Sequence, residues 1–276
     1  MMKRLDEDSA KQIKSLLTQC RLARKVICYE ETGSTNDDCR DMMQGDNKSI
    51  LVTAKTQNAG KGRRGRKWES PKDSSISFSL GLKPELDPSS APMLTTVMAL
   101  AVAKAIADTT GLKPLIKWPN DVVINGKKVC GILTEMNMDG GSIASVVIGV
   151  GINVSKMQLP KELEDKATSL EAEMEMENKE AAALSKPALI AGCVSCFEKL
   201  CNMVEEAKDL SPVKEEYEKF LVNMGRTVMV LDPAGNYSGT ATGITETGEL
   251  IVLRQDGTVS YVYAGEVSVR GIYGYA

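Results

Sequence analysis

The strongest chemical signal in the sequence is a glycine-rich cationic segment, Lys61-Gly-Arg-Arg-Gly-Arg-Lys67, in which five of seven residues are cations. Glycines let backbone N–H groups turn toward a ligand, and an arginine pairs with carboxylate or phosphate oxygens through two parallel hydrogen bonds. The segment follows an apolar run that is expected to be a strand. It is therefore a candidate site for an anionic ligand, with a solvated basic loop or a nucleic-acid contact as the alternatives.

The same segment matches the pattern GxGxxG between Gly60 and Gly65, which is typical of dinucleotide-binding folds. In those folds the pattern opens a helix, and an acidic residue follows about 20 residues later. Here Pro71 and the serine-rich strand that follows it forbid a helix, and Glu85 lies in a loop. The sequence therefore argues against a dinucleotide-binding fold.

Two further polar motifs interrupt apolar segments: Lys117-Trp-Pro-Asn-Asp121, with Lys128 shortly after it, and Gly149-Val-Gly-Ile-Asn153. An asparagine side chain offers both a donor and an acceptor, as recognition of an adenine or amide edge requires. Taken alone, the first motif is also typical of a turn with a packed tryptophan, and the second of a strand that ends in an asparagine turn. Lys128 alone is equally typical of a surface cation.

Composition excludes several kinds of chemistry. The 276 residues contain no His, which removes histidine-based triads, HExxH zinc sites and any imidazole acid or base. The net charge of −3 excludes a nucleic-acid coat over the whole surface, though not a local basic patch. No secretory signal or uninterrupted apolar stretch of membrane-spanning length is present, and the seven Cys are odd in number. We therefore expect a cytoplasmic protein with reduced thiols and no membrane association.

Apolar periodicity predicts strands over 25–29, 49–55 and 75–82; in the last of these, apolar residues alternate with Ser and Gly. Three later apolar runs end in GVGINV, and Asn125-Gly126 joins the first two as a strong hairpin signal. The expected fold class is α+β, with a mixed, largely antiparallel sheet and flanking helices.

Helices are predicted over 9–22, from Pro92 to Gly111, over 187–207 and over 212–224. Segment 161–180 carries eight acids and three Lys and is expected to be an exposed, mobile connection. From Arg226 onward glycines, β-branched residues and turn signals predict a small β-barrel. The expected division is residues 1–224, including a short N-terminal helix within 1–24, and residues 225–276.

Four motifs in sequence order resemble those of the biotin–protein ligases: GSTN (33–36), QNAGKGRRGRKW (57–68), KWPNDVVINGKKVCGIL (117–133) and GVGINV (149–154). The resemblance extends over about residues 25–270. It implies a class II synthetase-like, biotin–lipoate ligase-like catalytic fold and an SH3-like C-terminal barrel. It also implies that biotin and ATP, with Mg²⁺, give biotinyl-5′-AMP, and that a lysine of a biotin carboxyl carrier protein domain then accepts the biotin.

The resemblance further implies roles for individual residues. The expected biotin-binding residues are Ser34, Thr35, Asn36, Gln57, Gly60, Lys61, Gly62, Arg63 and Lys128, of which Lys61, Arg63 and Lys128 are the expected catalytic cations. The expected nucleotide-binding residues are Trp68, Asn120 and Asn153. Lys61 stands where many bacterial members have Arg, which keeps the charge but loses the planar fork.

About 24 residues precede the similar region, which is too short for the winged helix-turn-helix of bifunctional members, so no specific DNA binding is expected. A lipoate–protein ligase-like enzyme and a non-catalytic nucleic-acid-binding module are the alternative functions. The KWPND motif and the cationic loop favour biotin over lipoate. A nucleic-acid-binding module is disfavoured because such modules stack bases on several aromatic side chains, and Trp68 is the one aromatic residue near the cationic segment.

Overall fold

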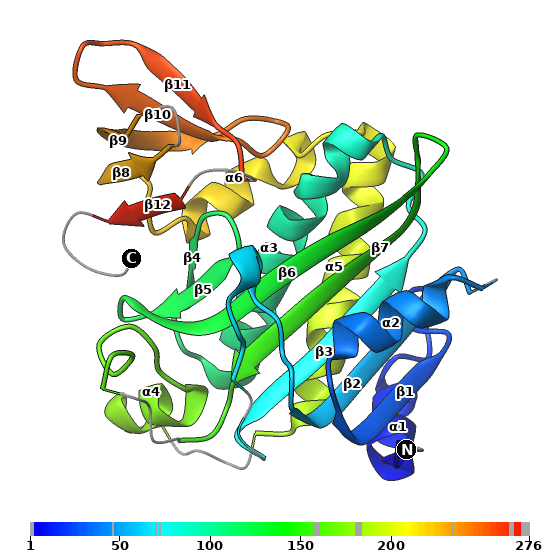
Figure 1. Ribbon diagram of the computed structural model, residues 1–276. Coiled ribbons are helices and arrows are strands. Elements are labelled where there is room, and N and C mark those ends of the chain that lie inside the picture. Colours follow the sequence, from blue (N-terminus) through cyan, green and yellow to red (C-terminus); the bar gives the residue numbers. More distant parts are fainter. Residues whose placement is uncertain are drawn as a thin grey trace.

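Seven strands form a mixed sheet in the computed structural model, which describes residues 3–45, 47–69, 71, 73–156, 161–179, 184–232, 235–264 and 268–271. In spatial order they are β1 (Val26–Thr32), β2 (Ser49–Gln57), β3 (Ser75–Leu82), β7 (Ser142–Asn153), β6 (Lys127–Asp139), β5 (Asp121–Ile124) and β4 (Leu115–Lys117) (Figure 1). β1 and β2 are parallel, and the other neighbouring pairs of this sheet are antiparallel. This confirms the predicted fold class. It also confirms the hairpin at Asn125-Gly126, where both residues have positive φ.

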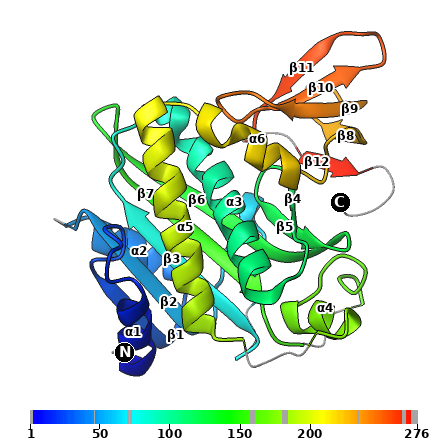
Figure 2. The same ribbon diagram turned by 180° about the vertical axis from the view of Figure 1, so that it is seen from behind.

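Helices cover both faces of the sheet. α2 (Thr35–Met43) packs on one face, over β2, β3 and β7, and α3 (Ala91–Thr110) and α5 (Lys186–Ala207) pack on the opposite face (Figures 1 and 2). α1 (Glu7–Leu16) lies beside β1 and α5, and ends before Cys20, so the helix predicted over 9–22 is shorter than expected. Two described helices, Pro88–Thr110 and Lys186–Ala207, are long and apolar enough to cross a membrane; 72% and 50% of their most apolar windows are buried, as in core helices.

The two-residue period of the strands builds a separate core on each face. In β2, Leu51 faces α3 and α5, whereas Ile50 and Val52 face α2. The prediction of one buried face on β3 was incomplete, because α2 covers its serine face as well. Ser79 is fully buried there, and an added Cβ at Gly81 would lie 2.7 Å from the Cys39 Sγ of α2.

The acidic segment is not only an exposed connection, because residues Leu170–Met176 form a helix, α4. Glu173 of this helix is 2% exposed. Its carboxylate accepts hydrogen bonds from Thr168 Oγ1 (2.6 Å) and from Asn125 Nδ2 (2.7 Å), which ties α4 to the β5–β6 hairpin. A buried acid with two donors is stable, but a count of charges along the sequence could not distinguish it from its exposed neighbours.

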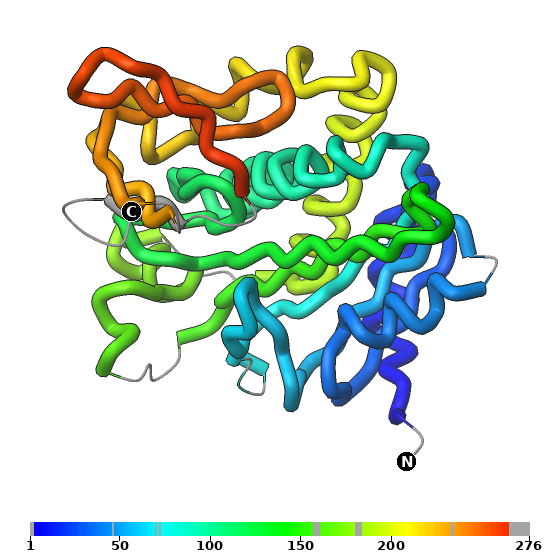
Figure 3. The backbone as a smooth tube through the Cα atoms, turned by 45° about the horizontal axis from the view of Figure 1, so that its top comes forward, coloured from blue at the N-terminus to red at the C-terminus, as the bar shows by residue number. Residues whose placement is uncertain are grey.

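The C-terminal residues form a second sheet, whose strands are β8 (Thr227–Leu231), β9 (Tyr237–Ile244), β10 (Leu250–Arg254), β11 (Val259–Val262) and β12 (Ser268–Gly271). Its order is β11-β10-β9-β8-β12 with antiparallel neighbours, consistent with the predicted SH3-like unit. In Figure 3 this sheet lies on one side of the molecule and the dark blue N-terminal segment on the other. α6 (Ser211–Phe220) joins the two sheets, and its Glu218 Oε1 accepts from Ile244 N (3.0 Å).

Candidate active site

Alternating glycines on two neighbouring strands form the floor of the site. In β7, Ile148, Val150 and Ile152 face the core under α3 and α5. The intervening Gly149 and Gly151 therefore face the opposite side of the sheet. Gly151 pairs with Gly131 of β6, and added Cβ atoms at these two positions would meet the Trp68 ring. An added Cβ at Gly149 would overlap the side chain of Asn36. The glycines are thus required because other side chains lie directly against the backbone.

The start of α2 and the end of β2 form one wall, which is polar and uncharged. Ser34 is the N-cap of α2, and its side chain makes no capping hydrogen bond. The Thr35 amide (2.8 Å) and Oγ1 (3.1 Å) both donate to Gln57 Oε1. Ser79 Oγ lies 2.6 Å from Asn36 Oδ1 and 2.8 Å from Thr35 Oγ1. The sequence motif GSTN thus places adjacent side chains and helix N–H groups around one spot, as recognition of a polar ring requires.

Residues 60–68 form a small closed hairpin over the floor. Trp68 N donates to Gly60 O (2.9 Å), and Gly62 N donates to Arg66 O (2.7 Å). Between these bonds lies the 3₁₀ turn η1 (Arg63–Gly65). An added Cβ at Gly60 would overlap the Trp68 carbonyl, so glycine is needed for closure. The cationic segment is therefore a hairpin with defined turns rather than the opening of a helix.

Three cations line the site: two lysines that are each paired with an aspartate, and one arginine. Lys61 Nζ lies 2.5 Å from Asp37 Oδ1, and Lys128 Nζ lies 2.6 Å from Asp121 Oδ1. Arg63 donates to Asn120 Oδ1 (2.7 Å) and to the Ala264 carbonyl of the C-terminal unit.

Within the described part of the chain, the acceptors of Arg63 are thus neutral oxygens rather than carboxylates. Burial lowers the pKa of its guanidinium, and the charges of Arg64 and Arg66 lower it further, against the opposing effect of Asp121. Arg63 is therefore the cation best prepared to receive an anion.

The Lys117–Asp121 motif connects the site to the C-terminal unit. Trp118, 2% exposed, donates from its backbone N to Asn223 Oδ1 (3.1 Å) and from Nε1 to the Gly248 carbonyl (3.0 Å). Asn120 Nδ2 donates to the Ile132 carbonyl (3.0 Å), which fixes Asn120 Oδ1 toward Arg63. Trp118 is thus a packed tryptophan, as one interpretation of this motif predicted. Asn120 lines the site.

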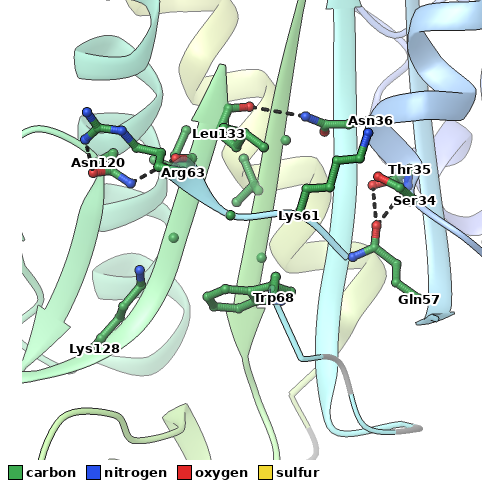
Figure 4. Close-up of a pocket in the computed structure, with 16 residues that line it drawn as sticks. Ser34, Thr35, Asn36, Gln57, Lys61, Arg63, Trp68, Asn120, Lys128 and Leu133 are labelled. Atoms are coloured by element: carbon green, nitrogen blue, oxygen red, sulfur yellow. Dashed lines mark hydrogen bonds between the residues drawn. The ribbon is translucent and has the colours of Figure 1, made fainter. Parts of the chain in front are cut away.

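These walls enclose a cavity of about 50 Å³ (Figure 4). Ten of the twelve residues predicted for the site line it: Ser34, Thr35, Asn36, Gln57, Lys61, Gly62, Arg63, Trp68, Asn120 and Lys128. Gly60 lies outside the lining; an added Cβ there would lie 3.2 Å from Nε2 of the lining residue Gln57. Asn153 lies outside the lining, and its Nδ2 donates to the Thr168 carbonyl (3.0 Å).

The structure also shows residues that were not predicted. They are the strand residues of the floor, and the side chains that orient the predicted residues: Gly131, Ile132, Leu133, Gly149, Val150 and Gly151, and Asp37, Ser79, Asp121 and Glu135. Gly149 and Gly151 could have been found from the period of two in GVGIN. The orienting residues carry no comparable signal, because their partners lie elsewhere in the sequence.

None of the thiols in the described residues is prepared for nucleophilic chemistry. Burial raises the pKa of Cys39 to about 12, with a further increase from Asp38. Burial likewise raises the pKa of Cys130, on the strand that carries Gly131, well above its usual value. Chemistry at this site must therefore rely on positioning and on the cations.

The chain matches two family models. Residues 28–153 match the biotin/lipoate A/B protein ligase family, and residues 224–270 match the biotin protein ligase C-terminal domain. The bifunctional ligase/repressor BirA of Bacillus spizizenii is 32% identical over 247 residues, which cover 88% of this chain and 74% of that protein.

This chain belongs to the biotin protein ligase family. Among relatives of this family, the biotin–[acetyl-CoA-carboxylase] ligase of Mycobacterium tuberculosis is 36% identical over 153 residues, covering 53% of this chain and 55% of that protein. The biotin protein ligase of Aquifex aeolicus, solved in complex with biotin and ATP, superposes with a TM-score of 0.75 and 27% identity, covering 90% of this chain and 99% of that one. The family resemblance inferred from the four motifs is thus confirmed.

Proposed function

We propose that this protein activates biotin with ATP to biotinyl-5′-AMP and transfers the biotin to a specific lysine of a biotin carboxyl carrier protein domain. The observation that carries the proposal is that the two ends of the cavity differ in polarity and charge. One end is polar, at Thr35 and Gln57, and the charge of Lys61 near it is paired with Asp37; the other end presents Arg63 and Lys128 (Figure 4). A glycine floor joins the two ends. This arrangement suits a ligand with a neutral polar ring and an anionic tail, as biotin has.

The polar end supports a role for Ser34, Thr35, Asn36 and Gln57 on the ureido ring. Gly60, Lys61, Gly62 and Arg63 would hold the carboxylate and the adenylate phosphate, and Lys128 would contact the reacting oxygens. Trp68 and Asn120, which line the cavity, would bind adenine. Asn153 would contact adenine only after its hydrogen bond to the Thr168 carbonyl is broken. We also propose that the catalytic part ends at residue 224 and that residues 225–276 form the second domain.

In the first step, a biotin carboxylate oxygen attacks the α-phosphorus of ATP. A new P–O bond forms while the bond to the bridging oxygen breaks, and diphosphate leaves. Two anions must approach each other for this step. Arg63 and Lys128 offset that repulsion in a partly buried site, where their charges act more strongly than in water.

In the second step, the carrier lysine amine attacks the acyl carbon, AMP leaves with the C–O bond electrons, and the amine loses a proton. The reaction needs no covalent enzyme intermediate, which agrees with the absence of His and with the raised pKa values of Cys39 and Cys130. Hairpin 60–68, which lies over the floor, would keep water from the mixed anhydride.

Mg²⁺ fits this site as a companion of ATP. Within the described residues no three His, Cys, Asp or Glu side chains gather to hold a metal ion. The ion would thus be held chiefly by phosphate oxygens and water, with the Asp121 carboxylate beside Lys128 as its protein partner. When bound, it would neutralise charge on the triphosphate.

The test is transfer to a purified carrier domain. The protein is incubated with MgATP, biotin and the unmodified domain, whose mass is then measured. We expect one biotin per domain, and none on a domain whose acceptor lysine is replaced by arginine. An unchanged mass with every carrier domain tried, together with no biotinyl-AMP, would refute the proposal.

A further inference from the structure

Lys61 does not point to the cationic end of the cavity. Its side chain is directed toward Asn36 and away from Lys128 (Figure 4). Its ammonium lies 2.5 Å from Asp37 Oδ1, with the two side chains 41% and 35% exposed. Lys61 therefore already has a carboxylate partner, although it lines the cavity where a substrate carboxylate is expected.

Asp37 is held in place independently of Lys61. It lies in the first turn of α2, directly after Asn36, and forms an ion pair with Arg40. Arg40 Nη1 lies 3.5 Å from Glu135 Oε1, and Glu135 Oε2 accepts from Asn36 Nδ2 (2.7 Å). Asp37 is thus part of a chain of charges that joins α2 to β6. It cannot simply follow Lys61 when that side chain turns to a ligand.

Asp37 is also ionised at neutral pH. Burial raises the pKa of its carboxyl, but the hydrogen bond and charge of Lys61, together with those of Arg40, outweigh burial and lower the pKa below its usual value. A negative charge therefore lies beside Asn36 and Lys61, which both line the cavity.

We propose that Asp37 is a specificity-determining residue that competes with the substrate carboxylate for Lys61. The proposal rests on biotin being the substrate. When the biotin carboxylate arrives, Lys61 must either leave Asp37 or hold two carboxylates close together, and both choices cost free energy. A ligand whose carboxyl group is neutral does not incur this cost.

The test compares biotin with biotinamide, in which a neutral carboxamide replaces the carboxylate. Dissociation constants for both are measured by calorimetry on the full chain and on Asp37→Asn. A partly exposed ion pair is worth roughly 0.2–1 kcal/mol, so biotin should bind about 1.4- to 5-fold more tightly to the variant. Biotinamide binding should not change. Asp41→Asn removes the same charge from the exposed side of the same helix and should leave both constants unchanged.

Three results would overturn the proposal: an equal change for both ligands, no change for biotin, or weaker biotin binding by Asp37→Asn. Asp37→Ser, which leaves a smaller neutral side chain, serves if the first variant melts at a lower temperature than the unmodified protein. A failure of the unmodified protein to bind biotin at all would instead refute the proposed function.

Discussion

At the scale of single residues, the hydrogen-bond partners of Arg63 allow its proposed contact with the adenylate phosphate to be tested. Its guanidinium contacts the Asn120 amide oxygen and the Ala264 carbonyl, and burial lowers its pKa. The adenylate phosphate would supply the missing counter-charge. We therefore expect Arg63→Gly to weaken biotinyl-5′-AMP binding by roughly 10- to 150-fold, the equivalent of about 1.5–3 kcal/mol, and to weaken biotin binding far less.

The measurement is the dissociation constant of each ligand by calorimetry. Arg64→Gly is the matched control, because Arg64 lies in the same turn, does not line the cavity, and has φ 59°, which glycine adopts without strain. It removes one charge from the hairpin but should preserve adenylate binding. Equal losses of biotin and adenylate affinity in Arg63→Gly would show that Arg63 does not contact the phosphate.

The floor glycines give a second prediction at this scale. In Gly149→Ala the new methyl group would overlap Asn36, and in Gly151→Ala it would overlap Trp68. We expect the first to weaken biotin binding and the second to weaken ATP binding, each by about tenfold. Gly192→Ala, in α5 with its nearest neighbour at 3.6 Å, should leave both affinities unchanged. Reversed effects of the two floor variants would contradict the proposed orientation of the ligands.

The sequence located ten of the residues that line the cavity, because their types are unusual and closely spaced, but it did not locate the strand residues of the floor. It could not show how they are oriented. Ala264 lies 201 positions from Arg63, and Glu135 lies 99 positions from Asn36. Such pairs have no local pattern, since a backbone carbonyl or a surface-type acid becomes a partner only through the tertiary fold.

At the scale of elements, hairpin 60–68 is the segment expected to move. The ring of its Trp68 lies against Gly131 and Gly151 of the floor, so movement of the hairpin would change access to the cavity. Five cations in seven residues repel one another until an anion neutralises them. Backbone amides of 60–68 should therefore exchange faster without ligand than with biotin and ATP, as hydrogen exchange with mass spectrometry would measure. Amides of α5 serve as the internal reference, and unchanged exchange in the hairpin would mean that it does not act as a gate.

Helices, strands and turns were predicted correctly where a short-range conformational preference alone determines them. The alternation in β3, the Asn125-Gly126 turn, and the glycine that ends α3 at Gly111 with φ 66° each follow from short-range conformational preferences. α4 was missed because its charged residues resemble a solvated segment. The buried serine face of β3 was missed because α2, a separate element, covers it.

At the scale of the whole molecule, Trp118 joins the two sheets. Its Nε1 donates to the Gly248 carbonyl in the C-terminal unit. Trp118→Phe should therefore lower the free energy of unfolding by about 1–3 kcal/mol, because the partly buried Gly248 carbonyl loses its donor. Urea unfolding would measure the change.

Trp68→Phe is a matched control for this loss of stability. Trp68 Nε1 is buried and has no hydrogen-bond partner among the described residues, so its removal should cost much less. If the two substitutions were equally destabilising, the Trp118–Gly248 hydrogen bond would not be what holds the units together.

The most direct test of the central claim is formation of the acyl-adenylate itself. The protein is mixed in excess with MgATP and limiting biotin, and in parallel with lipoate, and the quenched products are identified by mass spectrometry. The account predicts biotinyl-5′-AMP with release of diphosphate, a product that persists on the protein until a carrier domain is added, and little or no lipoyl-AMP. Lipoyl-AMP in place of biotinyl-5′-AMP, or no adenylate with either acid, would contradict it.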